Sequence, residues 1–181
     1  RKEKIDNFYW ERYRNYLLQE MNLSKNVVDK LSDKTLEELM NCLGDPLAEE
    51  PFLRRGLIIG DVQSGKTSTY IGLICKAADA GYRAIILLTG TIESLRAQTQ
   101  QRVESGFIGF DSQNQRRVGV GLDGKPLSIV SFTSKDDDFT GNKDTVVSSI
   151  EANKVIVFVI KKNVTVLRKL YKWLETINAN K

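Results

Sequence analysis

The stretch GDVQSGKT, residues 60–67, decides the fold of this chain. It matches the phosphate-loop pattern, in which four residues separate two glycines and the second glycine is followed by Lys and Thr. An apolar run at residues 56–59 precedes the stretch, and a helix-like run at residues 68–80 follows it. A strand, a glycine-rich loop and a helix are the context in which this pattern cradles phosphates. The sequence therefore predicts a protein that binds a nucleoside triphosphate.

Each residue type in this loop has a physical role. Gly60 and Gly65 allow backbone turns that a Cβ atom would obstruct. The N–H groups of the loop can then converge on one anion, aided by the positive end of the following helix. Lys66 would bring a charge to the β- and γ-phosphates, and Thr67 would offer a hydroxyl ligand to Mg²⁺. We therefore expect ATP and Mg²⁺ as ligands, with Lys66 and Thr67 as the catalytic candidates. The expected nucleotide contacts are Gly60, Asp61, Val62, Gln63, Ser64, Gly65, Lys66 and Thr67.

The composition is that of an ordinary globular protein, since 41% of the 181 residues are hydrophobic and 28% are charged. This length suggests one domain with a small appendage. No apolar run approaches the roughly 18 residues of a membrane span and no signal peptide is visible, so we expect a cytoplasmic protein without a membrane partner. The chain has no histidine, which excludes histidine catalysis and histidine metal sites. Cys42 and Cys75 lack metal-site spacing, and we expect both to be buried free thiols.

Residues 1–50 are predicted to be a helical appendage with a linker. Apolar residues at helical spacing predict three helices, of which the third begins at Ser32 or Asp33. The aromatic residues within 8–16 share this spacing, which favours a packed helical core over a base-stacking platform. The acidic, proline-bearing segment 45–51 indicates a linker.

From residue 55 onward, short apolar runs alternate with helical stretches. The expected strands are residues 56–59, 84–88, 128–133 and 155–160, and the expected helices are residues 68–80, 92–103, 144–150 and 163–177. The run 84–88 is apolar throughout, as in a strand that a parallel sheet buries on both faces. Such alternation predicts βαβ units and a mostly parallel sheet. The predicted fold class is α/β: a partial RecA-like P-loop NTPase lobe with flanking helices over residues 51–181, preceded by the helical appendage.

Positive charge is concentrated near the end of the chain. Residues 154–181 carry seven Lys or Arg against one Glu, whereas the whole chain has a net charge of +4. Such a cluster fits either a polyanionic partner or a solvated helix face. Lys161 and Lys162 directly follow an apolar run, and open α/β sheets gather their ligands at the carboxyl ends of strands. Both lysines are therefore candidates for contacts with a nucleic acid.

The segment LTGTIESLRAQTQQR, residues 88–102, runs from the end of a predicted strand into a helix. Superfamily-two helicases place their motif Ia here, with a helix start similar to Leu95-Arg96-Ala97-Gln98. Polar residues and N–H groups at a helix start can hold a nucleic-acid phosphate without reading the base sequence. Arg96 and Gln98 are the candidates for this role. The Pro-Thr-Arg of many such helicases is absent, and an ordinary polar helix start fits the segment as well.

Residues 56–109 resemble the Z-one domain family, a set of bacterial superfamily-two-type ATPases found in restriction–modification and phage-defence operons. The resemblance rests on the DVQSGKT loop, on KAADAGY at residues 76–82 and on LRAQTQQR at residues 95–102. The segment VIKKN at residues 159–163 is similar to the family too. The resemblance implies a nucleic-acid-dependent, helicase-type ATPase in DNA restriction or defence, with DNA and nuclease or methyltransferase components as partners.

No acidic pair follows a predicted strand where a hydrolysing P-loop enzyme needs one to hold Mg²⁺ and position water. The run 155–160 ends in lysines, and residues 136–138, Asp136, Asp137 and Asp138, are predicted to lie in a loop. Whether these aspartates substitute for the missing motif is left open. In the resembling family the acidic motif and a second RecA-like lobe lie beyond the equivalent of residue 181. We therefore expect part of a longer polypeptide, which binds nucleotide weakly and hydrolyses little by itself.

Two other functions fit the phosphate loop. A nucleotide-gated regulatory module would bind nucleotide equally well, but DNA would not change its affinity. A small-molecule kinase would need a lid with arginines, for which Arg116 and Arg117 in a glycine-rich segment are the candidates. The sequence leaves these alternatives open. It also does not distinguish DNA from RNA as the partner, or translocation from switching as the activity.

Overall fold

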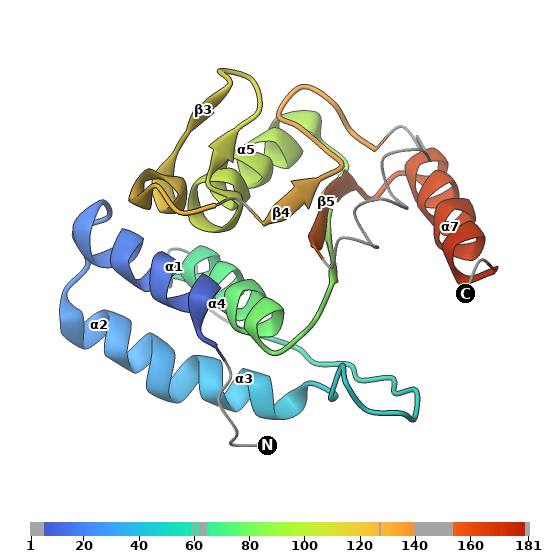
Figure 1. Cartoon of the computed structure of the whole chain (residues 1–181). Helices are drawn as coiled ribbons and strands as arrows, with labels where there is room; N and C mark the ends of the chain where they lie inside the picture. Colours follow the sequence, from blue (N-terminus) through green and yellow to red (C-terminus); the bar gives the residue numbers. More distant parts are fainter. Residues whose placement is uncertain (1–5, 60, 62–64, 127, 140–153, 180–181) are drawn as a thin grey trace. The chain divides into compact units, whose positions relative to one another are not determined.

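The computed structural model of the chain describes residues 6–59, 61, 65–126, 128–139 and 154–179. It divides into two compact units, Arg1–Tyr82 and Arg83–Lys181 (Figure 1). The fold is mixed α/β, with a three-stranded parallel sheet and flanking helices. This agrees with the coarse fold class that the sequence predicts. The predicted domain division near residue 50 stays a prediction.

The described part of the first unit is helical. Its first four elements are α1 (Phe8–Gln19), α2 (Lys25–Lys30), the π-helical turn η1 (Leu31–Leu36) and α3 (Glu37–Cys42). The last three follow one another without a break, so the new helix expected at Ser32 or Asp33 is wrong. A capping residue works only where the backbone leaves the helical region. Here Lys30, the residue before η1, has helical φ and ψ angles of −61° and −39°.

Helix α4 (Lys66–Asp79) packs against α1 and η1 within the same unit. Leu36 from η1 is fully buried against it. Gly72 of α4 allows this close approach, because a Cβ atom there would lie 2.8 Å from Leu36 Cδ1 and 3.2 Å from the ring of Trp10. The helix that follows the phosphate loop therefore shares its core with the N-terminal helices.

Residues 51–59 form no strand, which corrects the strand expected at residues 56–59. Leu57 and Ile59 are 84% and 86% exposed. A strand forms only beside a neighbour that completes its hydrogen-bond ladder. Among the residues that the structure describes, the strands of the parallel sheet pair only with one another. An apolar run was therefore not enough to make a strand here.

The second unit contains the parallel sheet, in the order β1-β5-β4. Its strands are β1 (Ala84–Thr89), β4 (Ile129–Ser131) and β5 (Val155–Lys161). Three of the predicted strands are thus confirmed. The central strand β5 is buried from its first residue to Ile160. The burial of both faces expected for residues 84–88 is wrong, because β1 is an edge strand and Leu88 is 48% exposed.

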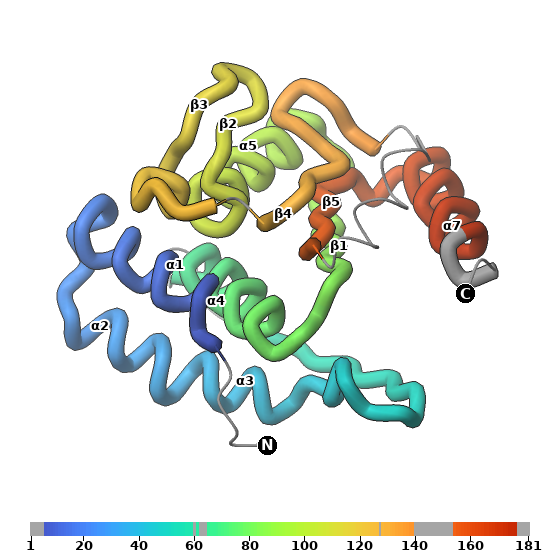
Figure 2. Tube along the Cα trace, viewed as in Figure 1, coloured from blue at the N-terminus to red at the C-terminus, as the bar shows by residue number. Residues whose placement is uncertain are grey.

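Two helices cover β5. The alternate residues Ile156, Phe158 and Ile160 pack into one core with Leu170 and Trp173 of α7 (Val164–Ala179). The helix α5 (Glu93–Val103) packs against β5 as well. Figure 2 shows β5 between α5 and α7. Both predicted helices are therefore confirmed, and they flank the sheet as expected.

The glycine-rich stretch after α5 contains several short elements of secondary structure. It forms the π-helical turn η2 (Glu104–Ile108), the short pair β2 (Phe110–Asp111) and β3 (Arg116–Arg117), and the 3₁₀ turn η3 (Gly119–Asp123). The helix expected at residues 144–150 lies outside the described residues. Cys75 is buried as expected, but Cys42 is exposed, so that expectation is wrong.

Candidate functional site

The end of the phosphate-loop pattern coincides with the start of α4. Gly65 lies just before the helix with φ of 80° and ψ of 14°, a left-handed conformation that suits glycine. Lys66 and Thr67 are the first two residues of a 14-residue helix. The first four N–H groups of a helix have no acceptor inside it and point toward any anion that binds there. Gly60, Val62, Gln63 and Ser64 lie outside the described residues.

The side chain of Lys66 turns back over the loop. Its Nζ donates a hydrogen bond to the carbonyl oxygen of Asp61, and both residues are exposed. A phosphate oxygen that bound the ammonium group of Lys66 would compete with this carbonyl. Thr67 is half-buried at the second helical position. These positions fit a nucleotide phosphate at Lys66 and a Mg²⁺ ligand at Thr67.

The first turn of α4 is held by α1. The hydroxyl of Tyr13 is hydrogen-bonded to Ser68, the residue directly after Thr67. Tyr13 is almost fully buried. Burial raises the pKa of the Tyr13 hydroxyl, and the bond to Ser68 only partly offsets this. A buried side chain from the N-terminal helices therefore helps to fix the turn that carries Lys66 and Thr67.

The last turn of α4 is tied to the start of α1. The carboxylate of Asp79 accepts hydrogen bonds from the backbone N–H groups of Tyr9 and Trp10, both at 2.9 Å. It thereby caps α1 from another element. Burial raises the pKa of Asp79 to about 6, although these two hydrogen bonds act in the opposite direction. In the same last turn, Lys76 Nζ pairs with Glu37 at 2.7 Å and lies 5.4 Å from the ring centre of Trp10.

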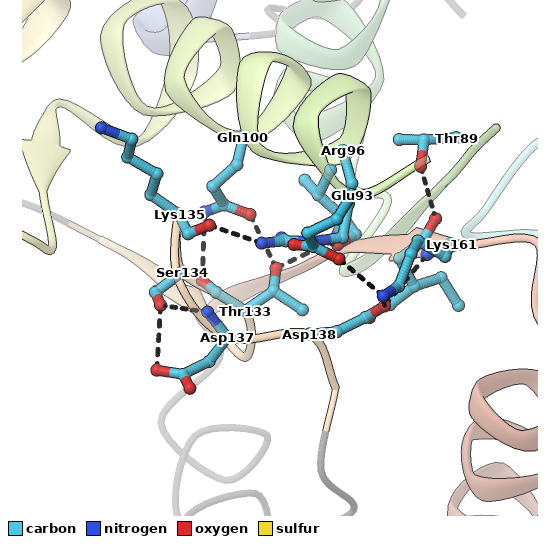
Figure 3. A network of polar contacts seen from close by, with 12 residues as sticks. Thr89, Glu93, Arg96, Gln100, Thr133, Ser134, Lys135, Asp137, Asp138 and Lys161 are labelled. Carbon is cyan, nitrogen blue, oxygen red and sulfur yellow. Dashed lines mark hydrogen bonds and ion pairs between the residues drawn. The ribbon is translucent and has the colours of Figure 1, made fainter. Parts of the chain in front are cut away.

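A polar network joins α5 to the carboxyl edge of the sheet in the second unit (Figure 3). Arg96 has no exposed surface. Its guanidinium donates hydrogen bonds to Glu93 at 2.6 Å, to the carbonyl of Lys135 at 2.6 Å and to the carbonyl of Val159 at 3.3 Å. The predicted contact between Arg96 and a nucleic-acid phosphate stays a prediction, but the structure gives this side chain a role inside the fold.

Gln100 extends this network one helical turn further. It is fully buried, and its amide exchanges hydrogen bonds with Thr133, donating to the carbonyl at 3.0 Å and accepting from the hydroxyl at 2.8 Å. Thr133 Oγ1 also accepts a hydrogen bond from the N–H of Val159 at 2.9 Å. Sequence reasoning missed Gln100 and Thr133. The available signal was the spacing of Arg96 and Gln100, which are four residues apart and share one helix face.

Two of the segments singled out in the sequence lie side by side at this edge. The N–H of Lys162 donates to the carbonyl of Gly90 at 3.3 Å, and the hydroxyl of Thr89 donates to the carbonyl of Ile160 at 3.1 Å. The start of α5 and the start of α7 therefore follow strand ends that are hydrogen-bonded neighbours. Asn163 caps the second of these helices through its side-chain oxygen, which accepts from the N–H of Thr165 at 2.9 Å.

The candidate nucleic-acid residues differ in their surroundings. Gln98 and Lys162 are exposed. Lys161 Nζ instead pairs with Glu93 at 2.6 Å and lies 3.9 Å from Asp138. Burial alone would raise the pKa of Glu93, but the hydrogen bonds from Lys161 and Arg96 lower it below the ordinary value. A phosphate at Lys161 would have to displace Glu93, whereas one at Lys162 would not.

The three aspartates after β4 do not act as one group. Asp136 is exposed, Asp137 accepts a hydrogen bond from the hydroxyl of Ser134 at 3.2 Å, and Asp138 accepts one from the N–H of Phe139 at 2.7 Å. Over the described residues, no cluster of three or more His, Cys, Asp or Glu is arranged to hold a metal ion. Thr67 stays a predicted metal ligand.

Comparisons with family models, with curated proteins and with solved structures found no match to this chain. The resemblance to the Z-one domain family therefore stays a prediction. Of the helices that the structure describes, none is both long and apolar enough to cross a membrane.

Proposed function

We propose that this chain is the ATP-binding part of a helicase-type, nucleic-acid-dependent ATPase of the Z-one type, acting in DNA restriction or defence. The observation that carries the proposal is that the pattern GDVQSGKT ends on the first two residues of α4. A helix start supplies unpaired N–H groups and a positive partial charge where the phosphates would bind. Lys66 adds a full positive charge at the same place.

In this proposal the loop binds and orients the phosphates of ATP. Lys66 moves from the carbonyl of Asp61 to the β- and γ-phosphates, and Thr67 holds the Mg²⁺ that bridges them. The bound Mg²⁺ neutralises charge on the phosphates. The chain contributes positioning and electrostatic stabilisation, and it offers no evident acid to position water. We therefore expect nucleotide binding with little or no turnover by this chain alone.

The nucleic acid is proposed to lie at the carboxyl edge of the sheet. Lys162 is exposed there, next to the segment that begins α5, and Gln98 is exposed on that helix. Helix starts and lysines bind a phosphate backbone without reading bases. DNA, a second RecA-like lobe and nuclease or methyltransferase components are the proposed partners.

Lys154 provides a matched control for Lys162. Both are exposed lysines that flank β5, one at its amino end and the other at its carboxyl end. We expect Lys162→Glu to weaken binding of a short DNA duplex severalfold and to reduce its salt dependence, while Lys154→Glu has a smaller effect. Equal losses in the two variants would argue against this edge as the nucleic-acid face.

The regulatory module remains the alternative. It differs from the ATPase in one measurable property, the effect of DNA on nucleotide binding. We expect the dissociation constant of Mg-ATP, measured by calorimetry, to change when the duplex is present. An unchanged constant would favour the regulatory module. Rapid ATP hydrolysis by the isolated chain would contradict the expectation that it lacks the acidic motif.

A further inference from the structure

A cavity of about 710 Å³ lies within the second unit, apart from every residue assigned above to nucleotide or nucleic acid. The described residues that line it come from three stretches of the chain, which are residues 104–112, residues 129–134 and residues 137–139. This volume is within the range of about 300–1,000 Å³ typical of sites for small molecules.

The wall of the cavity is mostly apolar and aromatic. Phe110, Phe132 and Phe139 contribute rings, and Ile108 and Ile129 contribute aliphatic surface. Phe132 is stacked on Phe158 with ring centres 5.2 Å apart, and Phe139 contacts the same ring at 5.1 Å. The aromatic side of the cavity is therefore part of the packed core and does not need a ligand to form.

The ionisable groups among the described lining residues are all acidic, beside four neutral hydroxyl groups of Ser and Thr. Its carboxylates are Glu104, Asp137 and Asp138, and no Lys or Arg occurs among the described residues that line it. Lys161 Nζ lies 3.9 Å from Asp138 and closer to Glu93. The ion pair with Lys161 offsets only part of the negative charge of Asp138. Such a lining repels phosphate groups and attracts cations.

Glu104 is the most constrained of these carboxylates. The residue is 3% exposed, and its Oε1 accepts hydrogen bonds from Ser112 Oγ at 2.8 Å and from Gln100 Nε2 at 3.2 Å. The backbone N–H of Ser112 donates to the same carboxyl group. Burial raises the pKa of Glu104 despite these donors. A positive charge nearby would stabilise the ionised carboxylate and lower this pKa.

We infer that this cavity binds a small organic cation, namely an ammonium group carried on an aromatic or aliphatic body. The ammonium group would lie between the carboxylates of Glu104 and Asp137, and the apolar body would lie against the phenylalanine rings. This inference does not rest on the phosphate loop, because every described residue that lines the cavity belongs to the second unit.

The test uses three probes of matched shape: 2-phenylethylamine, 2-phenylethanol and 3-phenylpropanoate. Each is titrated into the isotopically labelled chain, and binding is followed by chemical-shift changes of backbone amides. We expect the amine to bind saturably and at least about tenfold more tightly than the carboxylate, since opposite charges a few ångströms apart in such a cavity differ by more than this. The shifts should be confined to residues 104–112 and 129–139.

Two adjacent aspartates supply the matched variants. Both aspartates are exposed, but Asp137 is among the described residues that line the cavity and Asp136 is not. We expect Asp137→Asn to weaken the amine severalfold and Asp136→Asn to leave it unchanged. Glu104→Gln should also weaken the amine while leaving binding of the neutral alcohol unchanged. The inference is overturned if the carboxylate binds as tightly as the amine, if the two aspartate variants behave alike, or if the amine shows no saturable binding.

Discussion

The guanidinium of Arg96 donates a hydrogen bond of 2.6 Å to the carbonyl oxygen of Lys135, which fastens the segment after β4 to the first turns of α5. A second bond from the same group reaches the carbonyl of Val159 in the central strand. One buried side chain therefore links a helix, a strand and a connecting segment at the carboxyl edge of the sheet. The polar side chain of Arg96 on α5 therefore has a structural role inside the fold, beside its proposed role in ligand binding.

Replacing Arg96 by Met should destabilise the chain by about 2–4 kcal/mol. The apolar side chain leaves the carbonyls of Lys135 and Val159 without this donor, at about 1–3 kcal/mol for each buried group. Gln98→Met, on an exposed position of the same helix, should change the unfolding free energy by less than about 0.5 kcal/mol. Urea unfolding measures both. A stable Arg96→Met protein that has lost DNA binding would instead support a direct phosphate contact.

The periodic parts of the fold were predictable from sequence. Residues 155–160 are apolar without interruption and form the buried centre of the sheet, and the helix predicted at residues 163–177 corresponds to α7. The run at residues 56–59 is equally apolar and forms no strand, since strand formation depends on a partner that composition does not reveal. The sequence could not predict that β1 lies at the edge of the described sheet, because this position also depends on which strands pair.

The candidate site was predictable only where a motif names its residues. The loop pattern ends on Lys66 and Thr67, which are the first two residues of α4, so the helix begins two residues before the predicted residue 68. The role of Arg96 inside the fold was not predictable, because arginine is rarely buried and its partners Lys135 and Val159 are far away in sequence. The residues that line the cavity around Glu104 come from three separate segments, so no local sequence pattern could predict this cavity.

The Asp79 carboxyl should make stability fall as the pH rises. Its pKa in the folded chain is raised from 3.8 to about 6, so between these values the folded state holds a proton that the unfolded state has released. The unfolding free energy of the wild type, relative to that of Asp79→Asn, should therefore decrease across this window and level off above it. Urea unfolding at a series of pH values measures the difference. Parallel pH profiles for the two proteins would contradict this assignment.

The Tyr13 hydroxyl should protect the first turn of α4. Tyr13→Phe removes the hydrogen bond to Ser68, at a cost of about 1 kcal/mol. Amide hydrogen exchange should then become about fivefold faster at residues 66–70 and stay unchanged at the middle of the helix. Tyr16→Phe is the control, because Tyr16 lies on the same helix and is only half-buried. Uniform acceleration along α4 would indicate a general loss of packing and not a local anchor.

The measurement that tests the central claim most directly is calorimetric binding of Mg-ATP to the wild type, to Lys66→Ala and to Lys30→Ala. Lys66 stands at the start of α4, and Lys30 is an exposed lysine elsewhere in the same unit. We expect saturable binding by the wild type and by Lys30→Ala, and loss of binding by at least about tenfold in Lys66→Ala. Equal binding by all three proteins, or no binding by the wild type, would contradict a phosphate site at residues 60–67.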